Sequence, residues 1–360
     1  MSYSIGLIGC GHIAYKHVET ISSLSNVNVA AVSDLQEERM DAIVSMYQKK
    51  TNTTQAIKHY IDFADLISDP AVDIVVIAVV SGLHAEIAKQ ALQQQKHIIL
   101  EKPISLSLKD AEEINRLAKA YNRRVLVCHQ LRYRPFMSRL KELIDKGYFG
   151  EPYMGVASIR INRSKDYFQA ASWRGSWSMD GGMLVNQGIH VIDLMIWLLG
   201  EPVSVYGEIA NHSPEVKEIE DVAAGIISFS NKAKGIIEAN TVTKPENIGY
   251  QLSIFAEKGT VSISGPGLDK IDRCYVQDHD ELTEELKELA GRKEEHCRMY
   301  ENFIESMEGN TELLVTGEEG KRALEVIFGL YRSHQQGKII PSPLPSFSTT
   351  TMLDNFKNGK

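Results

Sequence analysis

The first residues with a chemically informative spacing are Gly9-x-Gly11-x-x-Ala14, which follow a short apolar run. Gly9 permits a tight turn out of a strand, Gly11 lets the backbone approach a phosphate, and Ala14 lets a helix pack closely on that strand. The N-terminus of such a helix offers free N–H groups and the positive end of its dipole. This turn therefore predicts a binding site for a dinucleotide pyrophosphate.

An acidic residue follows the next predicted strand, residues 27–32. Asp34 lies about 25 positions beyond Gly9, where a carboxylate accepts the ribose hydroxyls of an adenosine. The same carboxylate would repel a 2′-phosphate, so NAD is favoured over NADP. The alternative is an aspartate that merely ends a strand.

The second group, Glu101-Lys102-Pro103, directly follows a predicted strand at 97–101. An ammonium group in this position can donate to a substrate hydroxyl and stabilise the alkoxide while hydride leaves the carbon. Lys102 is therefore a candidate catalytic residue. An exposed lysine at a turn is the alternative.

The third group is Asn186-x-x-x-His190-x-x-Asp193, a spacing that predicts one face of one helix. Oxidation of an alcohol requires loss of the hydroxyl proton, and a neutral imidazole suits this task. Asp193 or Asn186 could orient the ring. A core or capping histidine is the alternative interpretation of His190.

Fork-shaped donors and aromatic rings gather between positions 160 and 174. Guanidinium groups recognise carboxylate and phosphate, and aromatic faces stack on sugar or base rings. Strand alternation puts Arg160 and Asn162 on one face and Arg163 on the other, so these side chains cannot all point into one site. The alternative is a solvated strand and surface loop. The substrate-binding candidates are Arg160, Asn162, Tyr167, Trp173, Arg174, Asn186 and His190.

The elements that would position these groups form two patterns. Residues 1–130 alternate strands and helices, which predicts an α/β dinucleotide-binding domain with a doubly wound (Rossmann) parallel sheet. Ligands of such sheets bind at the carboxyl ends of the strands. The cofactor-binding candidates there are Gly9, Gly11, His12, Ile13, Asp34, Val79, Ser81, His84, Glu101, Lys102 and Gln130.

Residues 131–345 show a different pattern. Alternating strands at 153–162, 203–210, 221–229, 233–241 and 251–256 are joined in part by short turns, and helices are expected at 136–146, 188–199, 296–307 and 318–333. This predicts an α+β substrate-binding and oligomerisation domain with an open, mostly antiparallel sheet. Residues 346–360 are expected to be a polar tail.

Composition restricts the partners. A net charge of −8 without a Lys/Arg cluster argues against nucleic acid or an anionic membrane. The four cysteines show no metal-site or disulfide spacing, so we expect no metal and a cytoplasmic protein. His84 and His129 follow strands but have no ligand-type neighbour at suitable spacing. The longest apolar run, residues 74–80, is too short to span a bilayer.

Together, four segments resemble the Gfo/Idh/MocA family: GLIGCGHIA at 6–14, LHAEIAKQAL at 83–92, EKPISLSLKDAEE at 101–113 and GGMLVNQGIHVIDLMIWLLG at 181–200. The resemblance implies an NAD(P)-dependent oxidoreductase of sugars or cyclitols that forms homodimers or homotetramers through its open sheet. It implies that Lys102 lies beside the nicotinamide before a cis proline, and that His190 is catalytic. Asn186 departs from the Asp of many members, and Val79-Val80-Ser81 departs from their Thr-Pro-Asn.

The segments WRGSWSMDGGMLVNQGIH at 173–190 and HQLRYRP at 129–135 resemble the nucleotide-sugar branch of that family, similar to UDP-N-acetyl-2-amino-2-deoxyglucuronate 3-dehydrogenases of polysaccharide synthesis. The branch often has Asn in the place of Leu131. The resemblance implies oxidation of a ring hydroxyl, C3 of a UDP-sugar. The alternatives are an inositol or free-sugar dehydrogenase, a glycoside hydrolase that recycles NAD, and a nucleotide-dependent regulator without turnover.

Overall fold

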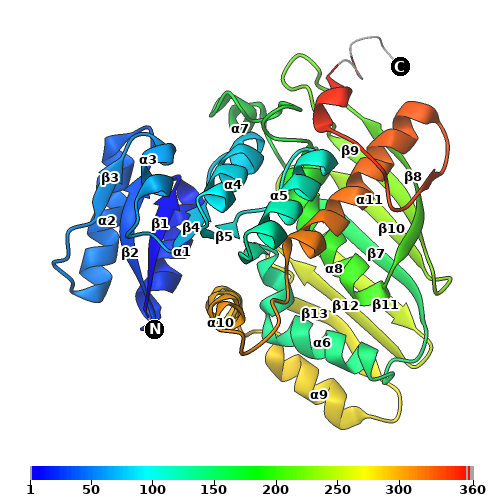
Figure 1. Cartoon of the computed structure of the whole chain (residues 1–360). Helices are drawn as coiled ribbons and strands as arrows, with labels where there is room; N and C mark the ends of the chain where they lie inside the picture. Colours follow the sequence, from blue (N-terminus) through cyan, green and yellow to red (C-terminus); the bar gives the residue numbers. More distant parts are fainter. Residues whose placement is uncertain (1, 354–355, 357–360) are drawn as a thin grey trace. The chain divides into compact units, whose positions relative to one another are not determined.

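The computed structural model describes residues 2–353 and 356, and the chain divides into two compact units (Figure 1). The first unit comprises Met1–Cys128 and His296–Lys321, and the second comprises His129–Glu295 and Arg322–Lys360. The predicted fold class, a doubly wound parallel sheet plus an α+β domain with a mostly antiparallel sheet, is confirmed.

The first unit is built on a six-stranded parallel sheet in the order β3-β2-β1-β4-β5-β6. Its strands are β1 (Tyr3–Ile8), β2 (Val27–Ser33), β3 (Lys58–Tyr60), β4 (Ile74–Ile77), β5 (His97–Leu100) and β6 (Val125–Val127). Between them lie α1 (His12–Ser23), α2 (Glu37–Thr51), α3 (Phe63–Ser68), η1 (Ser81–Leu83), α4 (His84–Gln93) and α5 (Leu108–Ala120). Every residue of β4 is buried, as expected for a parallel strand covered on both faces.

Residues 296–321, which the sequence analysis assigned to the second domain, pack in the first unit instead. They include most of α10 (Glu295–Met307) and the start of α11 (Gly317–Gln336). The Tyr300 hydroxyl lies 2.8 Å from His17 Nδ1. Arg124 Nε donates to the Ser306 carbonyl at 3.2 Å. These contacts join segments far apart in sequence, which local patterning does not register.

The second unit is built on an eight-stranded sheet in the order β13-β12-β11-β7-β10-β9-β8-β14. Its strands are β7 (Pro152–Arg160), β8 (Pro202–Ala210), β9 (Val222–Phe229), β10 (Lys234–Asn240), β11 (Gly249–Ala256), β12 (Gly259–Gly265), β13 (Lys270–Val276) and β14 (Ile340–Pro341). Neighbouring strands are antiparallel except β7 and β10, which are parallel.

Helices cover one face of this sheet (Figure 1). α8 (Ile189–Leu199) packs on β7 and β11, and α11 lies over β8 and β9. Gly207 and Gly225 are paired in register, and a Cβ on either would lie 2.6 Å from Leu330 Cδ2 of α11. The next pair, Tyr206 and Ile226, points to the opposite face and is exposed. The remaining helical segments are η2 (Gln130–Tyr133), α6 (Pro135–Asp145), α7 (Lys165–Gln169), η3 (Leu184–Gly188), α9 (Asp280–Leu289) and η4 (Thr349–Met352).

The described part of the segment that the sequence analysis named a polar tail packs on the second unit. The side chains of Phe347, Thr349 and Met352 are buried. Thr349 Oγ1 donates to the Trp177 carbonyl at 2.6 Å, and the Phe347 ring lies 5.0 Å from that of Phe328. None of the helices in the described residues is both long and apolar enough to cross a membrane.

Candidate active site

The glycine turn of the first unit connects β1 to α1. Gly9 has φ +91°, and a Cβ there would lie 2.5 Å from the Ala78 carbonyl oxygen, so the fold itself requires glycine. Around Gly11 no heavy atom of the described chain lies within 4 Å of a built Cβ, so its own packing would admit a side chain. Open space beside the N-terminus of α1, which no side chain of the described residues caps, fits the approach of a phosphate.

Asp34 accepts two backbone hydrogen bonds beside this turn. Its Oδ2 accepts from Cys10 N at 2.8 Å, and its Oδ1 accepts from Gln36 N at 2.9 Å. The carboxylate is therefore fixed next to the glycine turn. This position suits contact with a ribose, and it also gives Asp34 the structural role that the alternative interpretation required.

His84 supports the loop that follows β4. Its side chain is buried, with Nδ1 2.6 Å from the Pro103 carbonyl and Nε2 3.1 Å from the Val79 carbonyl. Burial lowers the pKa of this imidazole although both carbonyls oppose the shift, so the ring is neutral near pH 7 and only one nitrogen donates. Both nitrogens face the protein's own carbonyls, so any influence of His84 on a cofactor would act through the positions of Val79, Ser81 and Pro103.

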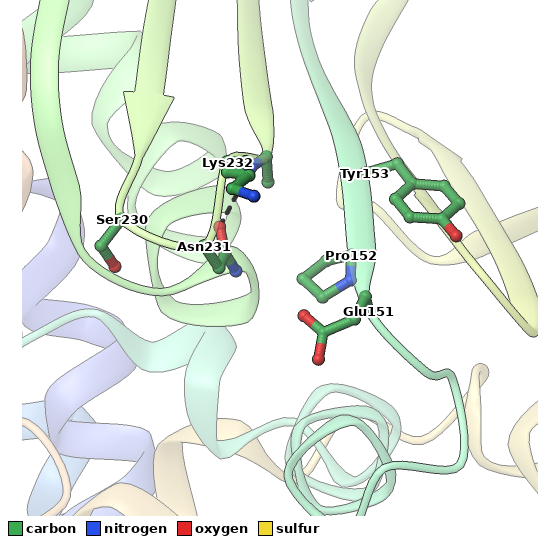
Figure 2. A pocket seen from close by; sticks show the side chains of 7 residues that line it. Glu151, Pro152, Tyr153, Ser230, Asn231 and Lys232 are labelled. Atoms are coloured by element: carbon green, nitrogen blue, oxygen red, sulfur yellow. Dashed lines mark hydrogen bonds between the residues drawn. The ribbon is translucent and has the colours of Figure 1, made fainter.

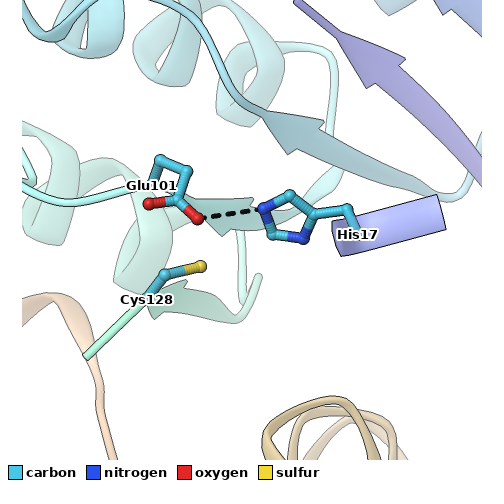
Figure 3. Close-up of side chains that lie close together, drawn as sticks. All are labelled: His17, Glu101 and Cys128. Carbon is cyan, nitrogen blue, oxygen red and sulfur yellow. Dashed lines mark hydrogen bonds and ion pairs between the residues drawn. The ribbon is translucent and has the colours of Figure 1, made fainter. Parts of the chain in front are cut away.

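Glu101 lies beside His17 of α1 and Cys128, which directly follows β6 (Figure 3). His17 Nε2 lies 3.0 Å from Glu101 Oε1, while His17 Nδ1 lies 2.8 Å from the Tyr300 hydroxyl. The Cys128 thiol completes a set of ligand-type atoms that all lie within 4.8 Å of one another. Burial, followed by repulsion from Glu101, holds the pKa of this thiol well above its usual range, so it is neutral.

Sequence reasoning placed Glu101 among the cofactor contacts but missed His17, Tyr300 and Cys128 as its supports. The nearest of them to Glu101 in sequence is Cys128, which gives no local signal. The next residue, Lys102, is half-buried at the end of β5, and the Lys102–Pro103 peptide bond is cis, as the family resemblance implied. The hydrogen-bonded cluster therefore fixes the backbone that carries Lys102.

In the second unit, His190 lies in the first turn of α8 and is half-buried. Its ring is 6.4 Å from that of His129, in an edge-to-face arrangement. His129 Nδ1 is 3.6 Å from Asp193 Oδ2, and Asp193 receives the Arg132 guanidinium at 2.9 and 2.7 Å. The hydrogen bonds of Asp193 thus go to Arg132, and its charge acts on His129 and His190 through space.

The spacing of Asn186 and His190 predicted that both lie on one helix. Asn186 lies instead in a π-helical turn, Leu184–Gly188, that precedes α8. Asn186 Nδ2 donates to Oδ1 of the buried Asp180. Leu184 N donates to Glu220 Oε1 at 2.9 Å. Two buried carboxyl groups therefore hold the turn. A π-turn is an irregularity that frequently occurs at functional sites.

Arg160 points to the open face of the sheet. Its guanidinium forms a two-pronged ion pair with Glu238 at 2.8 and 2.5 Å. The neighbouring residue Ile159 points to the other face, where its Cδ1 lies 3.8 Å from a Cβ built on Gly188. Alternation along β7 thus turns Arg160 away from α8. Because its charge is already paired with Glu238, Arg160 is a weak candidate for holding an anionic substrate.

The Tyr167 ring receives two other guanidinium groups. Arg163 lies 4.9 Å and Arg174 lies 4.3 Å from the ring centroid, and Gln187 Nε2 donates to the Tyr167 hydroxyl at 3.3 Å. Arg174 is also 5.4 Å from the Trp173 ring. Within the described part of the chain, no carboxylate lies within ion-pair distance of either guanidinium. We name Arg163, Tyr167 and Arg174 the arginine–tyrosine cluster.

The other candidates contribute less. Asn162 Nδ2 donates to the Pro245 carbonyl at 3.0 Å, so this amide supports a loop. Gln130 begins η2, is half-buried and belongs to the second unit. A shallow pocket of about 540 Å³ lies at the Pro152 end of β7, the end opposite Arg160, and is lined by residues 151–153 and 230–233 (Figure 2). No predicted site residue lines it.

Comparison with known proteins identifies the chain. Residues 3–129 match the NAD-binding Rossmann-fold model of the GFO_IDH_MocA oxidoreductase family, and residues 141–343 match its C-terminal α/β-domain model. The chain belongs to the Gfo/Idh/MocA family. It is an oxidoreductase, and its cofactor is NAD.

Relatives within the family differ in substrate. The chain is 24% identical over 351 residues to myo-inositol 2-dehydrogenase of Thermotoga maritima, covering 93% of this chain and 97% of that protein. It is also similar to the WlbA dehydrogenase of Bordetella pertussis, solved with NADH and UDP-GlcNAcA, at TM-score 0.85 and 29% identity over 95% of this chain and 98% of the other. WlbA from Chromobacterium violaceum gives TM-score 0.85 and 26% identity, with 95% and 96% covered.

Proposed function

We propose that this protein oxidises a ring hydroxyl, at C3, of a nucleotide sugar such as a UDP-N-acetylhexosamine uronate. When bound, NAD accepts the hydride from the carbon that is oxidised. His190 accepts the hydroxyl proton on its imidazole, and Lys102 donates a hydrogen bond to the oxygen on which negative charge develops. The glycine turn and Asp34 hold the dinucleotide.

The observation that carries the choice of substrate is the arginine–tyrosine cluster. Two half-buried guanidinium groups lie against one ring, and no carboxylate of the described residues neutralises them. Such a concentration of positive charge favours a ligand with a carboxylate or a diphosphate. A nucleotide-sugar uronate has both groups, whereas inositol and free hexoses have neither. The WlbA structures, which contain UDP-GlcNAcA, support the same choice.

A free cyclitol remains the second candidate, because the chain is also similar to inositol dehydrogenases from Thermotoga maritima and Lactiplantibacillus plantarum. The two candidates differ in charge, so they make opposite predictions about Arg163 and Arg174. Oxidation of inositol would be indifferent to loss of these guanidinium groups.

The test is an assay in which NADH formation is monitored by absorbance. UDP-GlcNAcA, UDP-GlcNAc, myo-inositol and glucose are each offered as the substrate. His190→Ala should retain NAD affinity and lower turnover by about two to four orders of magnitude. The Arg163→Met, Arg174→Met double variant should raise KM for UDP-GlcNAcA by roughly 10- to 100-fold, since each lost charge-assisted contact weakens binding of the anion. Arg116→Met, which removes an exposed guanidinium in α5, is the matched control.

Undiminished turnover of His190→Ala would overturn the catalytic assignment. An unchanged KM in the double arginine variant, or oxidation of inositol but not of any UDP-sugar, would overturn the substrate.

We further propose that the enzyme works in the cytosol as a homodimer or homotetramer. All four cysteines are free thiols, as is usual in a reducing compartment. The open face of the second sheet carries exposed aromatic and aliphatic side chains, including Tyr206, Ile226 and Phe255. Such a surface fits a second copy of the chain, and light scattering of the purified protein would report the copy number.

A further inference from the structure

A buried lysine in the loop that connects β8 to β9, residues 211–221, has no part in the proposed reaction. The Lys217 side chain is 4% exposed, and its Nζ donates to Asp221 Oδ2 at 3.0 Å. The backbone of Asp221 is bonded on both sides, since its N–H donates to the Ala210 carbonyl and its own carbonyl accepts from Thr241 N, each at 2.9 Å. The ammonium group of Lys217 is therefore held at a fixed point of the second sheet.

The charge of Lys217 is compensated by Asp221. Burial alone would raise the pKa of Asp221, but hydrogen bonds from His212 and Lys217 outweigh it and hold that pKa below its usual value. The carboxyl group is therefore ionised at neutral pH, and it also accepts from His212 N at 2.8 Å. Because a neutralised ammonium group adds little positive charge to its surroundings, an effect of Lys217 on a ligand must come from the residues that it contacts.

Lys217 contacts the direct neighbours of two members of the arginine–tyrosine cluster. Its Nζ lies 5.3 Å from the centroid of the buried Phe168 ring, and that centroid is 5.2 Å from the centroid of the Tyr167 ring, in an edge-to-face arrangement. Gly175 follows Arg174 and has φ +75°. A Cβ built on Gly175 would lie 2.8 Å from Lys217 Cβ and 3.0 Å from Phe168 Cδ1, so these three residues pack tightly.

Backbone hydrogen bonds join the two segments beside Lys217. The Gly175 carbonyl accepts from Glu218 N at 2.8 Å and from Ile219 N at 3.3 Å. Arg174 Nη1 donates to the carbonyl of Tyr167 at 3.0 Å. These bonds hold the end of the segment that carries Arg174, and the packing of Lys217 on Phe168 holds the end that forms α7.

We propose that Lys217 is a positioning residue that fixes Tyr167 through Phe168 and so determines the affinity of the arginine–tyrosine cluster for the anionic part of the substrate. The inference rests on the proposed nucleotide-sugar substrate, since a charged ligand is what would use this cluster. Both guanidinium groups lie against the Tyr167 ring, so a displaced ring moves both of them at once. Lys217 takes no part in hydride or proton transfer, so its loss should raise KM and spare kcat.

Lys217→Met gives a sharp test, because methionine keeps an unbranched apolar side chain and removes the ammonium group. Asp221 keeps the hydrogen bond from His212 N, so the buried carboxylate still has a donor. In the NADH assay we expect KM for UDP-GlcNAcA to rise roughly 3- to 10-fold, with kcat and NAD affinity within about twofold of wild type. Lys234→Met, which removes an exposed ammonium group from β10, is the matched control and should leave KM unchanged.

Phe168→Leu removes the other partner of the same contact. It should also raise KM for UDP-GlcNAcA and spare kcat. The effect of the double variant with Lys217→Met should be smaller than the product of the two single effects, because a shared contact is lost only once. Effects that multiply in full would mean that the two residues act independently, and would overturn the inference.

Hydrogen exchange of the whole chain without substrate measures the positioning directly. In Lys217→Met we expect faster exchange of the backbone amides of residues 164–176, with unchanged exchange in the buried strand β4. Unchanged exchange of residues 164–176, or an unchanged KM for UDP-GlcNAcA, would overturn the inference while the dehydrogenase function stood. If the wild-type protein oxidises no UDP-sugar, the proposed function fails, and hydrogen exchange then decides whether Lys217 positions α7.

Discussion

Asp193 and Glu220 are both carboxyl residues in the interior of the second unit, yet burial has opposite outcomes for them. Burial by itself would raise the pKa of Asp193, but the Arg132 guanidinium, and then His129, outweigh it and hold that pKa below its usual value. Glu220 receives the Tyr331 hydroxyl at 2.6 Å and Leu184 N at 2.9 Å. These donors are neutral, and burial raises the pKa of Glu220 to about 7.

Hydrogen bonds from neutral donors therefore do not compensate a buried negative charge as a guanidinium does. Asp193 is an ionised anchor for the arginine beside His129. Glu220 is a carboxyl group that changes charge near neutral pH. Within the described residues no hydrogen-bond donor reaches its Oε2 atom, which is consistent with the raised pKa.

Removal of the Asp193 charge should have the largest effect on stability. Asp193→Asn leaves Arg132 buried without its carboxylate, and we expect a loss of about 3–5 kcal/mol in the free energy of unfolding at pH 7. Because the folded pKa is lowered, the ion pair stabilises the protein in full above the usual aspartate pKa, and this contribution disappears as pH falls through the folded value. Urea unfolding of the full chain measures it.

The matched control is Glu238→Gln, which disrupts an ion pair of the same fork geometry on the exposed face. The Arg160 and Glu238 side chains are 34% and 47% exposed, so water screens the pair and we expect a loss below about 1 kcal/mol. If both variants lost the same free energy of unfolding, burial would not be the reason that the Arg132–Asp193 pair stabilises the protein.

Glu220→Gln should give the next largest effect, with the opposite sign. The raised pKa means that the folded protein binds more protons than the unfolded chain between the usual glutamate pKa of 4.5 and about 7, so stability falls as pH rises through that window. Glutamine imitates the protonated group. By pH 8 the variant should be more stable than wild type by up to about 3 kcal/mol, with no difference near pH 4.

Unfolding midpoints measured from pH 4 to pH 9 provide the check. The exposed Glu215→Gln serves as control and should follow the wild-type curve. Parallel curves for wild type and Glu220→Gln would contradict a neutral-range titration of Glu220.

Tyr331→Phe should have the smallest effect. It removes the hydroxyl that donates to Glu220 Oε1, which costs about 1 kcal/mol at pH 8, where the carboxyl is ionised. The upper end of the pH range over which stability falls should also move upward, because the ionised form loses a donor and the folded pKa of Glu220 rises. A pH profile that does not move would contradict a contribution of the Tyr331 hydroxyl to the pKa of Glu220.

Local sequence patterns predicted the parts of the fold that local physics determines. Short stretches of consecutive residues were enough to predict the turn at Gly9, the strand–helix alternation of the first unit and helix α8. Strand β13 was missed because it is an edge strand with mostly exposed side chains, so its seven residues show little hydrophobic pattern. The proposed site divides in the same way, since the spacing of Asn186 and His190 is local, whereas Glu220, which accepts from Leu184 N, is 36 positions from its partner.

The supports of the site depend on contacts across long stretches of chain. Arg132 and Asp193 are 61 positions apart, and Glu220 and Tyr331 are 111 positions apart. A single sequence carries no sign of such pairs. Arg163 was placed on the face opposite Arg160, yet its neighbours Tyr167 and Arg174 lie beyond β7, where strand alternation no longer applies.

The order of segments in the first unit limits how the enzyme can be dissected. A fragment that ends at residue 128 would contain the whole parallel sheet but would lack residues 296–321. It would lose Tyr300, the partner of His17 Nδ1, and expose the side chains that α10 covers. A cofactor-binding module for transfer to another enzyme would have to include this returning segment, joined to the fragment by a designed linker.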